Sequence, residues 1–150
     1  MRPPADPRFE ERVRASFARQ AIMATLGARL ERVAPGEVDV RLPFRADLAQ
    51  QHGFLHAGVV TTIVDSACGY AALTLMPPGS AVLSVEFKVN LLAPADGVAV
   101  IARARVLKAG RTITVATGDV FAIAANGAET LAATMTATLM VVSGRPGLAD

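Results

Sequence analysis

Hydrophobic residues at the start of the chain predict a helix followed by a hairpin. Apolar residues recur at helical spacing from Phe9 to about Leu26, and Gly27 follows as a helix stop. Two strand-like runs come next, at 28–33 and 37–42, with a Pro-Gly pair between them as in a β-hairpin. Three prolines among the first eight residues predict an irregular arm over 1–8.

The middle of the chain holds one long apolar segment, 56–76, in which Asp65 is the only charged residue among 21. As a helix it would extend roughly 30 Å, which is also the thickness of a bilayer core. An acid near the centre is costly in a membrane, and no second segment of this kind occurs. We therefore expect a helix enclosed within the protein and no membrane span.

The remaining sequence predicts β-structure. Gly-containing connectors of the kind found in antiparallel hairpins separate four longer strand-like runs, at 81–92, 98–107, 112–124 and 130–142. With the two early runs they predict one curved antiparallel sheet of about six strands, whose concave face the apolar helix would cover. The expected class is α+β, with an extra N-terminal helix, one domain over 1–150 and a flexible tail at 144–150.

Polar and apolar residues alternate through 81–92, so side chains of one parity should share a face of that strand. Even-numbered positions are mostly polar and include Ser84, and odd-numbered positions are apolar. The pattern predicts one regular strand with a polar and an apolar face.

Composition narrows the class of protein. Of 150 residues, 52% are hydrophobic and 19% are charged, so the chain can bury a core and is not disordered. A formal net charge of +2 gives no electrostatic case for nucleic acid. The single cysteine, Cys68, cannot form an intrachain disulfide, and charged residues stand where a signal peptide would be apolar. We expect a cytoplasmic protein.

The segment before and within the apolar helix resembles a known signature. Gln50-Gln-His-Gly-Phe-Leu-His56-Ala57-Gly58, followed by six residues and Asp65, is similar to that of the PaaI-type acyl-CoA thioesterases of phenylacetic acid degradation. In that family His-Gly-Gly precedes an acidic residue on the central helix. Ala57 stands where the family often has Gly, and Gln50 where many members have Asn.

Two later segments extend the resemblance to about residues 25–142. The run 83–90, which contains Ser84, is similar to the strand after the family's helix, and Lys108-Ala-Gly-Arg111-Thr112 is similar to its basic hairpin. The resemblance implies a hotdog fold and hydrolysis of an acyl-CoA thioester without a metal or redox cofactor. It also implies a homodimer, often paired into a dimer of dimers, with coenzyme A entering only as part of the substrate.

The residues themselves support an acyl-transfer site. A carboxylate on an apolar helix costs several kcal/mol unless it is paired, neutralised or faces a cavity, so we interpret Asp65 as a base or nucleophile. Backbone N–H groups of Ala57 and Gly58 would lie at the helix start, where they can stabilise an oxyanion. The alternatives are an Asp held for packing and ordinary helix capping.

Supporting residues have weaker signals. His56 would fix the loop beside the oxyanion donors, as the resemblance implies, or is merely structural. Gln50 would orient water or the carbonyl, or satisfy the loop backbone. Ser84 would hydrogen-bond Asp65, as the resemblance implies, or is an ordinary strand residue. His52 and His56 are four apart, but Gly53 lies between them and no further His completes a metal site, so no metal is predicted.

Basic residues gather near the Gly-containing connector between the runs 98–107 and 112–124. Lys108 and Arg111, with Thr112 beside them, would bind coenzyme A phosphates, and Arg103 and Arg105 lie on the strand that leads to them. The alternative is a solvated edge whose charges prevent aggregation.

Spacing along the helix predicts the assembly. Ala57 and Asp65 are eight residues apart, which is about 12 Å along a helix axis. A reacting carbonyl must lie near 3 Å from both donor and attacking group, which one helix cannot arrange. Two antiparallel helices from two chains can, so we expect an active homodimer.

Other functions stay open on the sequence alone. A non-catalytic acyl-CoA binding module on the same fold would keep the pocket and the basic hairpin, but it would not require Asp65. A hydratase would need a catalytic His beside a carboxylate, and no Asp-x-x-x-x-His pattern follows Asp65. A purely structural oligomer would explain the strands but not the acid in the helix.

Overall fold

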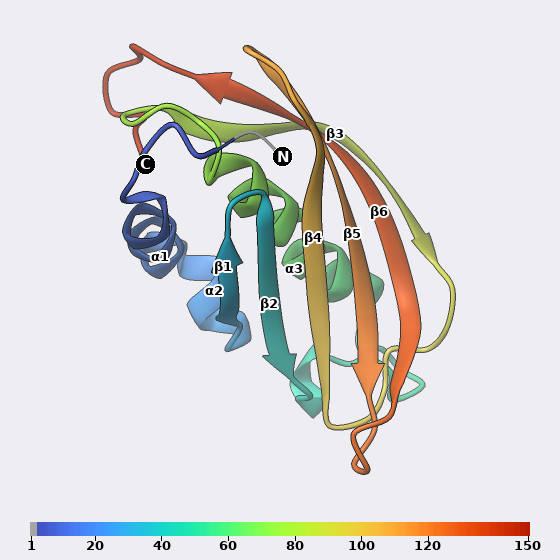
Figure 1. Cartoon of the computed structure of the whole chain (residues 1–150). Coiled ribbons are helices and arrows are strands. Elements are labelled where there is room, and N and C mark those ends of the chain that lie inside the picture. Colours follow the sequence, from blue (N-terminus) through green and yellow to red (C-terminus); the bar gives the residue numbers. More distant parts are fainter. Residues whose placement is uncertain (1–2) are drawn as a thin grey trace.

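The six predicted strands form one sheet in the computed structural model, which describes residues 3–150. Neighbouring strands are antiparallel, in the order β1-β2-β4-β5-β6-β3. Their bounds are β1 (Arg29–Ala34), β2 (Glu37–Pro43), β3 (Ala81–Leu91), β4 (Ala99–Ala109), β5 (Ile113–Ile123) and β6 (Glu129–Val142). The sheet curves around helix α3 (Ala57–Leu73), as Figure 1 shows, and the predicted α+β hotdog fold is confirmed.

Helix α3 is the centre of the core. Eleven of its 17 residues are buried, and it packs against strands β2, β3, β4, β5 and β6, because its apolar side chains line most of its circumference. The α-helix ends at Leu73, before the expected end at Met76. At this end, Thr74 Oγ1 donates to the Ala71 carbonyl and accepts the Gly36 N–H, both at 2.7 Å, which ties the helix end to the β1–β2 turn. Within residues 3–150, none of the helices is both long and apolar enough to cross a membrane.

A glycine lets β5 approach α3 closely. A Cβ built on Gly118 would lie 2.6 Å from Val64 Cγ2 and 3.0 Å from Cys68 Sγ, well inside ordinary contact distance. Val64 directly precedes Asp65, so β5 packs closely against the turn of α3 that carries Asp65.

The single N-terminal helix expected over 9–26 is wrong, because the chain forms two helices. Helices α1 (Phe9–Arg19) and α2 (Ala21–Leu26) are separated by Gln20, whose backbone is extended (φ −78°, ψ 92°). The break changes the direction of the chain, and α1 still packs on the α3 side, where Phe17 and Tyr70 have ring centroids 5.6 Å apart. Because the helical spacing of apolar residues continues across Gln20, the sequence pattern does not predict the break.

The regular alternation expected along 81–92 is also wrong. The register between β3 and β6 shifts between Ser84 and Glu86, which leaves Val85 as an extra residue in a β-bulge. Val82 and Val89 both pack against the core although their parity differs. A bulge inserts one residue and so reverses which parity faces inward.

The end of the chain, expected as a free tail, folds back against the body of the protein. Asp150 lies beside α1 and the start of β3, where its backbone N–H donates to the Ser80 carbonyl at 3.3 Å. A short 3-10 turn, η1 (Ala46–Leu48), lies in the loop between β2 and α3.

Candidate active site

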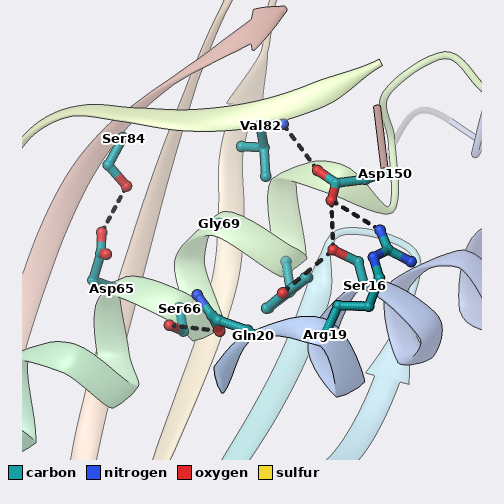
Figure 2. A pocket seen from close by; sticks show the side chains of 10 residues that line it. Ser16, Arg19, Gln20, Asp65, Ser66, Gly69, Val82, Ser84 and Asp150 are labelled. Carbon is teal, nitrogen blue, oxygen red and sulfur yellow. Dashed lines mark hydrogen bonds and ion pairs between the residues drawn. The ribbon is translucent and has the colours of Figure 1, made fainter. Parts of the chain in front are cut away.

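Asp65 and Ser84 meet at the wall of a cavity between α3, β3 and the α1–α2 junction. Ser84 Oγ donates a hydrogen bond of 2.7 Å to Asp65 Oδ1 (Figure 2). Asp65 is partly exposed and faces this cavity of about 310 Å³, whereas its neighbours Val64 and Ser66 are buried. The cavity removes the cost of burying a carboxylate inside an apolar helix. The predicted contact between these two residues is present.

The cavity has polar groups along its whole length. Its other lining residues are Ser16, Arg19, Gln20, Ser66, Gly69, Tyr70, Val82 and Asp150. Several of these polar groups already bond one another, for example Ser66 Oγ, which donates to Gln20 Oε1 at 3.4 Å. Apart from Asp65 and Ser84, none of these residues has a recognisable signal in the sequence, because α1 and the chain end reach the cavity only through tertiary contacts.

At the N-terminus of α3, His56 acts as the capping residue. Its Nδ1 accepts the Gly58 N–H at 2.9 Å, so this ring nitrogen carries no proton. The expectation that the Gly58 N–H is a free donor is therefore wrong, because this amide already donates to the His56 side chain. The Ala57 N–H has no acceptor within residues 3–150, and it is the donor that stays available at this helix end.

Gln50 lies in the loop that leads to this cap. Its side-chain oxygen accepts the His52 N–H, and its backbone N–H donates to the Phe54 carbonyl at 2.8 Å. Gly53 closes this turn with φ +88°, a conformation that other residues rarely adopt. Gln50 thus organises its own loop, while its side chain also lines a second cavity.

The second cavity is lined by only one half of the predicted site. It has a volume of about 300 Å³ and is lined by Gln50, Ala57, Val60 and residues of the β3–β4 connection. Asp65 and Ser84 are absent from its lining, and Ala57 is absent from the lining of the first cavity. Within one chain the acid and the free amide therefore open into different spaces.

The basic hairpin, between β4 and β5, lies at the C-terminal end of α3 and away from the N-terminal end of that helix (Figure 1). Arg111 lines a third cavity of about 260 Å³ together with Met76 and Pro77. Among residues 3–150, neither Lys108 nor Arg111 has an acidic partner within ion-pair distance. Thr112, in the turn, offers its carbonyl to the Val141 N–H at 2.9 Å.

Arg103, which the sequence grouped with the hairpin, is occupied elsewhere. Its guanidinium binds both oxygens of Glu129 at 2.6 and 2.7 Å and stacks over the Phe121 ring. The Glu129 hydrogen bond raises the pKa of Arg103 and lowers that of Glu129. The Arg103–Glu129 pair therefore belongs to the outer face of the sheet and not to the hairpin.

Cys68 lies one turn after Asp65 and is buried. Burial, followed by the charges of Asp65 and Asp119, raises the pKa of this thiol to about 12, so it stays protonated and cannot act as a nucleophile. Within the described residues, His, Cys, Asp and Glu side chains do not gather in any group of three that could hold a metal ion.

Comparison with known proteins places this architecture in a family. Residues 52–124, which contain His56, Asp65 and Ser84, match the Thioesterase superfamily. A thioesterase family protein from Silicibacter pomeroyi is 56% identical, its solved structure superimposes with a TM-score of 0.89, and the match covers 91% of this chain and 99% of that one.

More distant proteins agree. A predicted esterase of Halobacterium salinarum is 32% identical over 100 residues, which cover 63% of this chain and 66% of that protein. The PaaI protein of the E. coli phenylacetic acid degradation operon is 18% identical, with a TM-score of 0.81 over 93% of this chain and 97% of that one, and therefore shares the fold. These likenesses support thioester hydrolysis as the general class of activity. The chain belongs to the Thioesterase superfamily, as the resemblance of its motifs predicts.

Proposed function

We propose that this protein hydrolyses acyl-CoA thioesters to a carboxylic acid and free coenzyme A. The observation that carries the proposal is the hydrogen bond from Ser84 to Asp65, which holds a carboxylate at the wall of a cavity in an otherwise apolar helix. A carboxylate in such a place can attack the thioester carbonyl or take a proton from an attacking water. Either route breaks the bond between the carbonyl carbon and sulfur and releases coenzyme A as the thiolate, which takes up a proton. When water attacks, the carboxylic acid forms directly; when Asp65 attacks, water then hydrolyses the acyl–Asp65 anhydride to free the acid and regenerate the carboxylate.

The oxyanion that forms on the carbonyl needs a donor, and the free Ala57 N–H at the start of α3 is the one we assign. His56 positions this amide by capping the helix, and Gln50 shapes the loop before it. The positive end of the helix dipole adds to the stabilisation of the developing charge.

Because Asp65 and Ala57 open into different cavities of one chain, we place the complete site between two protomers. The Ala57 amide of one protomer would face Asp65 of the other, across two antiparallel α3 helices. Strand β3 supports this assembly because it is an edge strand that exposes large apolar side chains, namely Leu83, Val85, Phe87 and Leu91, at 42–56%. Such an edge is a template for pairing with a second chain. We expect a homodimer, and a dimer of dimers as its further assembly.

Lys108 and Arg111 would bind the phosphates of coenzyme A, with Thr112 beside them. Both cations are free of acidic partners in the described chain, as a phosphate-binding pair requires. No metal or redox cofactor takes part in the proposed reaction. Cys68, a free buried thiol, fits the cytoplasmic location that we propose.

Release of free thiol from a panel of acyl-CoA substrates tests the proposal directly. The native protein should turn over at least one of them, and Asp65→Asn should lower kcat about 100-fold or more while the protein stays folded. A variant within a few-fold of native kcat would contradict the role of Asp65. A native protein that binds acyl-CoA without releasing thiol would instead be a binding module.

A further inference from the structure

The far end of the cavity that contains Asp65 is already filled by a carboxylate of the chain itself. Asp150 Oδ1 accepts a hydrogen bond of 2.6 Å from Ser16 Oγ and lies 3.6 Å from Arg19 Nη2. Asp150 Oδ2 accepts the Val82 N–H at 3.4 Å (Figure 2). We name these three donors, from Ser16, Arg19 and Val82, the carboxylate seat.

The seat lies a short way along α3 from the proposed reaction centre. Tyr70, whose hydroxyl is 3.4 Å from Ser16 Oγ, comes five residues after Asp65 and therefore about 7.5 Å further along the helix axis. Residues from both ends line the same cavity. A short acyl group whose carbonyl lies at Asp65 would thus direct its other end towards Asp150.

Charge decides what such an acyl end can carry. Two acids, Asp65 and Asp150, line the cavity, and Arg19 is the one cation among its lining residues. An acyl group that ends in a carboxylate would bring a third negative charge and would find the donors for it already taken. Specificity is often obtained by such a repulsive element against the wrong ligand.

We propose that Asp150 is a specificity-determining residue: by occupying the carboxylate seat, it excludes ω-carboxyacyl groups and leaves the cavity to uncharged acyl groups. This inference depends on the proposed thioesterase function, which it deepens by naming the substrate class. Its converse is that removal of Asp150 frees Ser16, Arg19 and Val82 to bind the carboxylate of a dicarboxylic half-thioester.

The test compares pairs of thioesters that differ only in the terminal group, such as adipyl-CoA and hexanoyl-CoA, in a series from succinyl to suberyl. The native protein should prefer the uncharged member of each pair. Asp150→Ala should raise kcat/KM for the carboxylated member, relative to its uncharged partner, by about tenfold or more at the matching length. An unchanged ratio at every length would overturn the proposal.

Two further variants identify the cause. Asp150→Asn removes the charge but can still accept the Ser16 hydrogen bond, so it should raise the ratio less than Asp150→Ala does. Adding Ser16→Ala to Asp150→Ala removes a donor of the seat and should reverse most of the gain. Glu10→Ala, which removes an exposed acid of α1 that pairs with Arg14, is the matched control and should leave the ratio at the native value.

Calorimetry with the free acids separates this inference from the proposed function. Adipate should bind Asp150→Ala about tenfold more tightly than it binds the native protein, and hexanoate should not show this gain. If no variant hydrolyses any thioester but adipate binds as stated, the activity is wrong and the seat stands. If hydrolysis occurs but neither the rate ratio nor the binding changes, the seat is wrong and the activity stands.

Discussion

Ser84 reaches Asp65 because a β-bulge at Val85 directly follows the serine. The bulge shifts the register of β3 against β6 and changes which parity faces inward, so that Ser84 points at α3 while Val89 further along the strand also packs inward. Bulges beside active sites commonly redirect a side chain in this way. The 2.7 Å hydrogen bond gives the carboxylate one fixed orientation.

Ser84→Ala should therefore lower kcat about tenfold or more and leave KM for acyl-CoA nearly unchanged. A hydrogen bond to a charged group contributes roughly 1.5–3 kcal/mol, and its loss frees the orientation of Asp65 without touching the rest of the binding surface. Steady-state kinetics measures both parameters. Ser84→Thr keeps the hydroxyl and should recover part of kcat; equal losses in both variants would argue for a packing role instead.

Part of this site could be predicted from the sequence because its signals are local. Asp65 stands out as the only charged residue of an apolar helical segment, and Ala57 is placed by its position at the helix start. The six strands could also be predicted from the sequence, since connectors that contain Gly separate runs of apolar and alternating residues.

Other features have no local signal. The bulge at Val85 changes the register by one residue without changing the alternation of residue types. The use of the Gly58 amide by His56 depends on where one side chain points. Asp150 reaches Ser16 across 134 positions of sequence, and no periodicity within either segment records such a contact.

Gly118→Ala should destabilise the protein by about 1–3 kcal/mol, because the new methyl group would lie 2.6 Å from Val64 Cγ2 and 3.0 Å from Cys68 Sγ. Chemical denaturation measures the free energy of unfolding. Val64→Ala on the Gly118→Ala background removes the nearest obstructing methyl group, so the two changes together should cost less than their sum. Strict additivity would show that the contact between β5 and α3 is not the cause.

Replacement of Lys108 and Arg111 by Ala should raise KM for acyl-CoA while kcat changes little. Surface charges that hold the nucleotide end of the substrate contribute equally to the ground state and the transition state. The effect should shrink as salt rises, because exposed charges are screened.

An acyl-pantetheine, which lacks the nucleotide, is the control substrate for this double variant. Its KM should be the same for the native protein and for the variant. If KM for acyl-CoA is also unchanged, at low and at high salt, the hairpin is a solvated edge and takes no part in binding.

The shared site can be tested by complementation between two inactive variants. Asp65→Asn removes the carboxylate, and Ala57→Pro removes the amide that we assign to the oxyanion. Proline is suited to this test because Ala57 is the first residue of α3, where the missing N–H interrupts no helical hydrogen bond. His56 before it has extended backbone, φ −62° and ψ 140°, which is the conformation that a following proline requires.

Each homodimer should be nearly inactive, since both of its sites lack the same group. In a mixed dimer, one site combines the Ala57 amide of the Asp65→Asn protomer with the carboxylate of the Ala57→Pro protomer, while the other site lacks both. Half of the sites in each mixed dimer are then complete, so a statistically refolded mixture, in which half of the dimers are mixed, should regain about a quarter of native activity. Mass spectrometry of the intact complexes measures the mixed fraction, and thiol release measures the activity. Verified mixed dimers without recovered activity would show that Asp65 and Ala57 do not act across the interface.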